Sequence, residues 1–191
     1  MKAGWAVVGT FILPAVLMMV LRSARGDARL HDPNPAVRVA AVRCLTVGSD
    51  ADQWVSALKD DDSDVRLLSA MRLGGGRPHA TSATGTDRLV PALIDALKDR
   101  HAGVRRAAAE ALGEWWPANE KALADALTDP DARVRAGAAF ALSWAPDCIE
   151  MLERKVTTAQ AELLRPLLRA LLNDEDREVR RNATWALARI R

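Results

Sequence analysis

A pattern of apolar and polar positions recurs five times along the chain, each time around a Val-Arg dipeptide. Apolar or small residues dominate the third, fourth, seventh and eighth positions after the valine, and the eighth is always leucine. These positions form one stripe along a helix, because a helix turns once in 3.6 residues. An aspartate precedes each valine by five positions. The segments are DPNPAVRVAAVRCL from Asp32, DDDSDVRLLSAMRL from Asp60, DRHAGVRRAAAEAL from Asp99, DPDARVRAGAAFAL from Asp129 and DEDREVRRNATWAL from Asp174.

Each stripe predicts one helix of a helical hairpin. The predicted helices start near Val37, Val65, Val104, Val134 and Val179. A polar turn precedes each of them, and a second apolar stretch with helical spacing precedes the last four turns. A single hairpin of this size cannot bury its apolar face, so the units must stack. The pattern therefore predicts an all-α fold, a short α-solenoid of about five helical hairpins over residues 32–191.

Two junctions between the predicted hairpins carry extra sequence. The first, GGGRPHATSATGTDR at 74–88, has no apolar period and predicts an exposed loop. It has neither a dinucleotide fingerprint nor a GK[ST] ending, so its glycines do not indicate a phosphate site. In the second, at 145–162, apolar residues recur at helical spacing and indicate a short extra helix.

The N-terminal residues have a different character. Residues 3–21, AGWAVVGTFILPAVLMMVL, are a run without a charge and are flanked by basic residues. As a helix this run spans about 28 Å, which matches the hydrocarbon core of a bilayer. We therefore expect one transmembrane helix as an anchor at 1–22, then a junction at 23–31. A cleaved signal peptide is the alternative, although its apolar region is normally about 7–15 residues and ends in a small-x-small site.

The flanking charges and the cysteines give an expectation about location. Three arginines follow the apolar run, whereas only Lys2 and the amino terminus precede it, which favours a cytoplasmic repeat domain. The alternative, after signal-peptide cleavage, is an exported or periplasmic domain. Cys44 and Cys148 are far apart and lie among apolar residues, so we expect free, buried thiols, which agree with a reducing compartment.

Composition narrows the classes of fold and of site. The 27 Lys and Arg nearly balance the 25 Asp and Glu, so no strong field recruits nucleic acid. A β-sandwich needs many aromatic and β-branched residues, and this chain has no Tyr and two Phe. His31, His79 and His101 have no Cys or His at metal-ligand spacing. We expect no metal and no cofactor.

The repeated Asp-x4-Val-Arg turn resembles that of the HEAT repeat family, especially the HEAT-like repeats also found in bilin lyases. Pro91 and Pro166 lie eight residues before a turn aspartate, where the family often has a proline in its first helix. The resemblance implies that the turn Asp and the Arg after Val form a ladder between neighbouring repeats, with a structural role. This assigns Asp32, Asp60, Asp99, Asp129 and Asp174 to pair with Arg38, Arg66, Arg105, Arg135 and Arg180.

Large apolar residues occur where the concave surface of such a stack is expected to meet water. Met71, Phe140 and Trp185 share one position on the outer side of the second helix, and Leu67 lies beside the first of them. An exposed apolar patch is a candidate site for a partner protein. The alternative is that these residues pack between adjacent helices. The remaining tryptophans near helix ends are expected to fill gaps between repeats: Trp54, Trp115, Trp116 and Trp144.

Three functions follow from these patterns. The leading one is a membrane-tethered scaffold module that binds another protein, since helical-repeat stacks offer extended surfaces and no catalytic constellation is visible. The second is an enzyme component of the bilin-lyase type or another HEAT-like enzyme. The hydroxylase that modifies deoxyhypusine has similar repeats but needs His-Glu pairs, and none of the three histidines is followed by Glu.

The third is nucleic-acid binding, as in HEAT-like DNA glycosylases. Arg106, Arg181 and Trp185 are expected on the concave side, where a basic and aromatic surface can hold a strand. The acidic turns and the balanced charge argue against this function. We therefore expect a protein partner, with the membrane contacted through residues 3–21.

Overall fold

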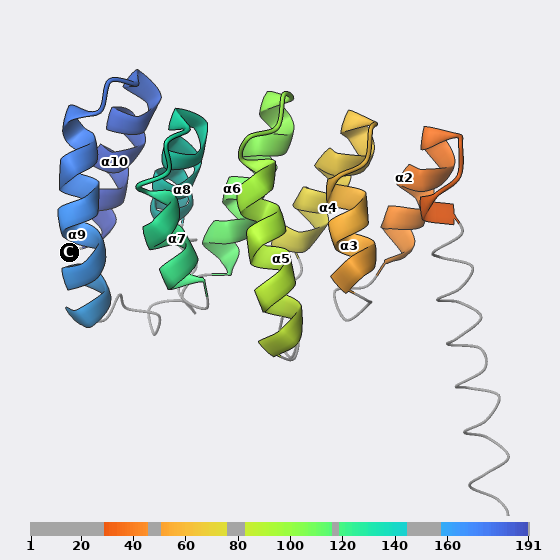
Figure 1. Ribbon diagram of the computed structural model, residues 1–191, viewed down its shortest axis with the longest axis horizontal. Coiled ribbons are helices and arrows are strands. Elements are labelled where there is room, and N and C mark those ends of the chain that lie inside the picture. The colour runs from red at the N-terminus through yellow and green to blue at the C-terminus, as the bar shows by residue number, and fades with distance from the viewer. Residues whose placement is uncertain (1–28, 46–50, 76–82, 116–118, 145–157, 191) are drawn as a thin grey trace, which may run out of the picture. The chain divides into compact units, whose positions relative to one another are not determined.

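The computed structural model describes residues 29–45, 51–75, 83–115, 119–144 and 158–190 (Figure 1). The chain divides into two compact units, Met1–Leu45 and Thr46–Arg191. In the first unit, helix α2 (Pro35–Cys44) follows a turn, and Leu30, Val42 and Leu45 are buried. All regular structure in the described ranges of both units is helical.

The described residues of the second unit form four helical hairpins arranged in two layers. The first helices, α3, α5, α7 and α9, pack in order against one another, and so do the second helices, α4, α6, α8 and α10 (Figure 1). Each hairpin joins one helix of each layer. The helices are α3 (Ala51–Leu58), α4 (Ser63–Gly75), α5 (Ala83–Ala96), α6 (Ala102–Glu114), α7 (Glu120–Ala126), α8 (Ala132–Trp144), α9 (Thr158–Ala170), the short 3₁₀ helix η2 (Leu171–Asn173) and α10 (Arg177–Arg189).

The predicted apolar stripe forms the core of this unit, which confirms the α-solenoid. Each of the second helices α4, α6, α8 and α10 begins two residues before the repeated valine. The four valines, Val65, Val104, Val134 and Val179, are fully buried. Burying such a side chain contributes about 1.5–3 kcal/mol relative to leaving it in water. The repeated valine is therefore the point at which each second helix attaches to the core.

The repeated aspartate and arginine shape the turn of their own hairpin. In all five copies an aspartate oxygen accepts the backbone N–H two residues later, at 2.7–2.9 Å. In all five the arginine Nη1 donates to the aspartate carbonyl and to the next carbonyl. Carbonyls in a tight turn need such donors because they have no helical partner. The sequence pattern thus marks a self-supporting turn.

The residue three positions before each valine caps the second helix in four of the five turns. Asn34, Asp62, Asp131 and Asp176 each accept a backbone N–H from the first turn of their helix. His101 occupies the same position before α6 and makes no such bond with its side chain.

Replacing His101 with Asp is therefore expected to stabilise the protein by about 1 kcal/mol, because it supplies the missing cap. Three other turns already carry Asp at this position, so the turn tolerates it. Urea denaturation of the variant measures the gain. His101→Ala is the control and should leave stability nearly unchanged, since no cap bond is lost. Equal stability of the Asp variant and the wild type would contradict the prediction.

The first predicted loop is shorter than the sequence suggested. We expected loop from 74 to 88, but α4 continues through Gly75 and α5 already begins at Ala83. Helix extends readily from an existing helix, since each added residue gains one backbone hydrogen bond. The buried Leu89 fixes α5 in the core, and Arg88, in the middle of α5, forms an ion pair with Asp52 of α3. Residues 76–82 lie outside the described ranges.

The prediction that Cys44 is buried is wrong, because its side chain is exposed. Ala41 and Val42 are the buried residues of α2. Cys44 is the last residue of α2, and its side chain lies outside the core that Ala41 and Val42 enter. Leu45, one residue further on, is buried instead.

Several expectations fall on residues outside the described ranges. These are the apolar run at 3–21, the possible helix within 145–157, Cys148 and Trp116. In the part of the chain that is described, no helix is both long and apolar enough to cross a bilayer.

Candidate functional site

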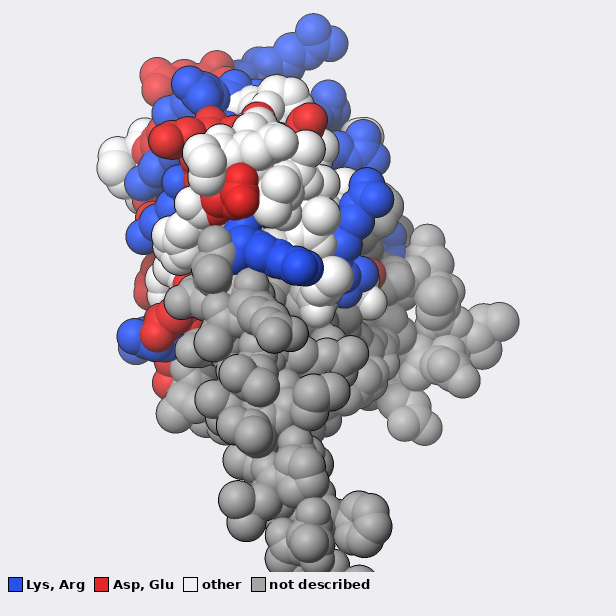
Figure 2. Space-filling model, turned by 90° about the vertical axis from the view of Figure 1, so that its right-hand side faces the viewer, with Lys and Arg blue, Asp and Glu red and all other residues white. Residues whose placement is uncertain are grey.

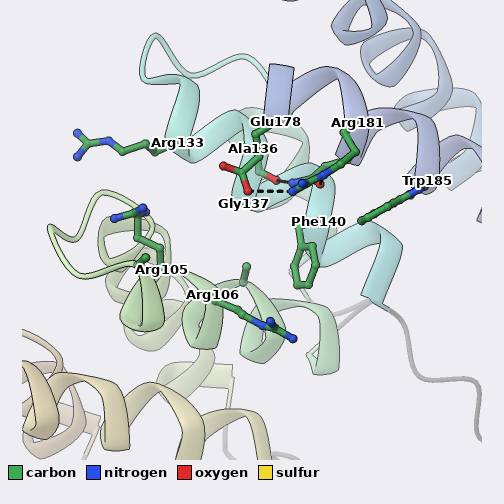
Figure 3. A pocket seen from close by; sticks show the side chains of 12 residues that line it. Arg105, Arg106, Arg133, Ala136, Gly137, Phe140, Glu178, Arg181 and Trp185 are labelled. Carbon is green, nitrogen blue, oxygen red and sulfur yellow. Dashed lines mark hydrogen bonds and ion pairs between the residues drawn. The ribbon is translucent and has the colours of Figure 1, made fainter. Parts of the chain in front are cut away.

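A groove crosses the second helices α6, α8 and α10 and encloses about 510 Å³ (Figure 3). We call it the arginine–aromatic groove. Its hollow shape follows from the small side chains Ala102, Ala109, Ala136 and Gly137 on its walls. Its larger lining residues are Arg105 and Arg106 of α6, Arg133 and Phe140 of α8, and Glu178, Arg181, Asn182 and Trp185 of α10.

Gly137 permits the close approach of helices at this groove. A Cβ at this position would lie 2.6 Å from Cδ2 of Leu97, which is fully buried. A side chain here would force Leu97 to shift, so glycine favours this close approach of α8 to the end of α5. Asn182, also buried, donates from Nδ2 to the carbonyl of Ala136 at 3.0 Å and so joins α10 to α8. The groove is thus held by packing and by a buried hydrogen bond.

The structure brings two of the four predicted partner-binding residues into the groove. Phe140 is half-buried, and Trp185 is 50% exposed. Met71 is 57% exposed and Leu67 is half-buried, but both belong to α4 and do not line the groove. On α6, between these two parts, the same helical position is occupied by Glu110, which pairs with Arg106. The predicted patch is therefore interrupted by an ion pair.

Charged side chains surround the aromatic part of the groove. Arg106 Nε donates to Glu110 at 2.8 Å, and Arg181 Nη2 donates to Glu178 at 3.0 Å. The guanidinium of Arg181 also lies 5.2 Å from the ring centre of Trp185, within range of a cation–π interaction. In Figure 3, Arg105 and Arg133 extend to one end of the groove, away from Phe140 and Trp185.

The wider described surface carries both signs of charge. Figure 2 shows one face of the molecule on which acidic and basic side chains lie around an uncharged area. This agrees with the near balance of charges in the sequence. The local excess of arginine in the groove is therefore a feature of that site.

The predicted ladder residues make inter-repeat ion pairs at two places. Arg66 donates from Nε and Nη2 to Asp99 of the next repeat, at 2.6 and 3.1 Å. Arg135 holds Asp174 in the same way, at 2.8 and 3.0 Å. All four side chains are at most 12% exposed. Such bidentate pairs are among the strongest hydrogen bonds in proteins.

The predicted pair between Arg105 and Asp129 is not formed. Asp129 lies 3.5 Å from Lys98 and makes no ion pair with Arg105. Arg38 and Arg180, like the other repeated arginines, donate to the carbonyls of their own turns. The guanidinium thus always supports its own turn, and it joins neighbouring repeats through a carboxylate at two junctions of the described second unit.

The pKa values of the paired aspartates are lowered. Burial raises the pKa of Asp99, but the hydrogen bonds from Arg66 and from the His101 backbone outweigh this and hold it below the ordinary 3.8. For Asp174 the hydrogen bonds from Arg135 are the main cause of a lowered pKa. At the surface, the side chain and backbone N–H of Arg133 lower the pKa of Asp131 to about 2.

Acid is expected to weaken the stack of repeats because it protonates Asp99 and Asp174. Their pKa values are lower in the folded protein than in the unfolded chain, so they contribute stability above about pH 3.8. As the pH falls below that value, the unfolded chain binds protons first and the contribution is lost. Urea denaturation near pH 6 and near pH 3 measures this. Asp99→Asn should be less stable near pH 6 and lose less on acidification, and an equal loss in both proteins would contradict the assignment.

Comparison with known families decides what kind of repeat this is. The family model for HEAT repeats matches residues 51–143, 91–162 and 120–191, which together cover most of the chain. The chain belongs to the HEAT-repeat family. The bilin-lyase type of HEAT repeat is not distinguished by this match. A search of curated proteins gives no match.

The chain also aligns with several solved structures. A microtubule polymerase structure with TOG domain arrays, described for tubulin recruitment, aligns with a TM-score of 0.59 at 15% identity. That alignment covers 85% of this chain and 39% of the other, and at this identity it shows the fold alone. An engineered protein aligns at 23% identity with a TM-score of 0.44, covering 88% and 78% of the two chains. A designed armadillo repeat protein in complex with the peptide (KR)4 aligns at 18% identity with a TM-score of 0.44, covering 85% and 79%.

Sequence reasoning missed two arginines of the groove in this HEAT-repeat chain. Arg105 was assigned to the ladder, and Arg133 lies just before the repeated valine, at a position that was not expected on the concave surface. Both arginines flank the repeated valine, one on α6 and the other on α8, and this position is the signal in the sequence that could have identified them. Within the described ranges, no group of three or more His, Cys, Asp or Glu residues is arranged to hold a metal ion.

Proposed function

We propose that this HEAT-repeat protein binds a segment of another protein in the arginine–aromatic groove. The observation that carries the proposal is that Phe140 and Trp185 lie in one groove with four arginines. Trp and Arg are enriched among the residues that dominate binding energy at protein interfaces. The volume, about 510 Å³, lies within the range of about 300–1,000 Å³ that is typical of ligand pockets.

Comparative crosslinking tests this proposal. The wild type and the double variant Phe140→Ser, Trp185→Ser are crosslinked in native membranes, and the attached proteins are compared by quantitative mass spectrometry. We expect the double variant to lose at least one partner. Met71→Ser is a matched control, because Met71 is a similarly exposed apolar residue outside the groove. An unchanged set of partners in the double variant would remove the groove from the proposal.

A second candidate function is the binding of single-stranded nucleic acid. It is favoured by the position of Arg106, Arg181 and Trp185 in one groove, since bases stack on tryptophan and phosphates pair with arginine. Salt-sensitive retention of labelled single-stranded DNA by the protein, lost in Trp185→Ser, would favour this function over the first.

An enzymatic role of the bilin-lyase type is tested by analysing purified protein for a bound bilin or metal.

We further propose that residues 3–21 tether the protein to a membrane with the repeats on the cytoplasmic side. The support is the length of the uncharged run and the basic residues after it. The exposed thiol of Cys44 provides a test in a variant that carries Cys148→Ser. A membrane-impermeant maleimide should label Cys44 only after spheroplasts are permeabilised. Labelling of intact spheroplasts would contradict the orientation, and release of the protein by alkaline carbonate would contradict the tether.

A further inference from the structure

Arg105 differs from its counterparts in the neighbouring repeats. Arg66 and Arg135 use Nη1 for their own turn and Nε with Nη2 for an aspartate of the next repeat. Arg105 also uses Nη1 for its own turn, at 2.9 Å from the carbonyl of Asp99. Its Nε and Nη2, however, have no carboxylate partner among the residues that the structure describes. The turn therefore holds this guanidinium in place through Nη1, and Nε and Nη2 remain as donors for another carboxylate.

Arg105 is also one of the residues that line the arginine–aromatic groove. Arg105 is half-buried and lines the groove together with Arg133 of the next helix. In Figure 3 both guanidiniums lie at the same end, whereas Phe140 and Trp185 lie toward the other. The groove therefore has a basic end and an aromatic end.

We propose that the groove binds an acidic linear segment of a partner protein. A carboxylate of the segment pairs with Nε and Nη2 of Arg105, and a large apolar side chain packs against Phe140 and Trp185. This inference rests on the proposed function and names the chemistry of its partner. The chain itself shows what these two donors bind, because Asp99 and Asp174 accept from them in the other repeats at 2.6–3.1 Å.

The charges of the groove favour a peptide over a nucleic acid. Glu178 lines the groove and holds Arg181, and Glu110 holds Arg106 beside it. These carboxylates neutralise the arginines nearest the aromatic end and repel a continuous row of phosphates. At the basic end Asp131 already pairs with Arg133, so Arg105 is left to bind one carboxylate. A segment with an acidic residue and a separate apolar residue satisfies both ends.

Selection from a library of short random peptides displayed on phage tests this inference. The full chain, kept in mild detergent, is used as the wild type and as Arg105→Lys. The substitution keeps the positive charge but removes the paired Nε and Nη2 donors. Arg180→Lys is the matched control, since Arg180 clamps its own turn in the same way but does not line the groove. Phe140→Ser removes the aromatic end. Circular dichroism confirms that each variant is folded.

We expect the selected peptides to combine Asp or Glu with a large apolar residue. The affinity of a synthetic copy should fall about tenfold or more in Arg105→Lys, because charge-assisted bidentate bonds are lost, and should stay unchanged in Arg180→Lys. Selected peptides without acidic residues that depend on Phe140 but not on Arg105 would overturn the acidic segment while the proposed function stands. If no selected peptide depends on Phe140, the proposed function fails as well. Tighter binding of an oligothymidine strand, lost in Arg105→Lys, would replace the peptide with a nucleic acid.

Discussion

Replacing Arg66 with Ala is expected to lower the free energy of unfolding by about 3 kcal/mol. The side chains of Arg66 and Asp99 are only 8% and 9% exposed, so the substitution leaves a carboxylate at a buried junction without its partner. It also removes the donor to the carbonyls of Asp60 and Asp61 in the turn before α4. A solenoid depends on contacts between neighbouring repeats, so the loss acts at the junction of two of them. Urea denaturation followed by circular dichroism measures it.

Arg133 provides the matched control for this prediction. It makes a similar pair with Asp131, at 2.7 Å, but at the surface, where water and ions screen the charges. Arg133→Ala should leave the urea midpoint nearly unchanged. Equal effects of the two substitutions would show that burial of the ion pair does not determine its contribution.

Replacing Trp115 with Ala is expected to destabilise the protein by about 3–5 kcal/mol, the range for a large buried aromatic residue. Trp115 is 3% exposed and follows α6 directly. Its Nε1 donates to the carbonyl of Leu73 at 3.0 Å, near the end of α4, where carbonyls have no helical partner. The substitution therefore leaves a cavity between two repeats and removes a hydrogen bond. Thermal unfolding followed by circular dichroism measures the loss.

Trp185 serves as the control for Trp115. It is 50% exposed, so Trp185→Ala removes little buried surface and weakens mainly the contact with Arg181. We expect a change within about 1 kcal/mol. A large loss of stability in Trp185→Ala would mean that this residue is part of the core, and would weaken its assignment to a binding surface.

The apolar stripe made most of the fold predictable from the sequence. Valine and leucine at fixed offsets define which face of each second helix is buried, and Val104 and Leu112 are both fully buried as that pattern requires. Two features were less predictable. The direction of the repeated guanidinium toward its own turn depends on backbone geometry that the pattern does not contain. The end of a stripe is also uncertain by a residue or two, which is why Cys44 was misplaced.

The candidate site was predictable only in part, because it depends on how neighbouring helices are placed. Phe140 and Trp185 were identified from their shared position in the repeat. The role of Arg105, in contrast, depends on the pairing of Asp129 with Lys98 instead of with Arg105. Glu110 was visible in the sequence at the position of Met71 and Phe140, and it indicates that the patch is not continuous. The Asn or Asp three positions before the repeated valine in four of the five turns is a helix-capping signal that can be read from the sequence.

Photocrosslinking from residue 185 tests the central claim, that this groove binds another protein. Benzoylphenylalanine replaces Trp185 in one variant and Leu163 of α9 in a second. Both positions carry large apolar residues with similar exposure, 50% and 46%, but Leu163 does not line the groove. We expect a discrete crosslinked protein band from position 185 that is absent from position 163 and weakened by Arg105→Lys. Crosslinks of equal yield and pattern from both positions would contradict the claim that the groove is the binding site.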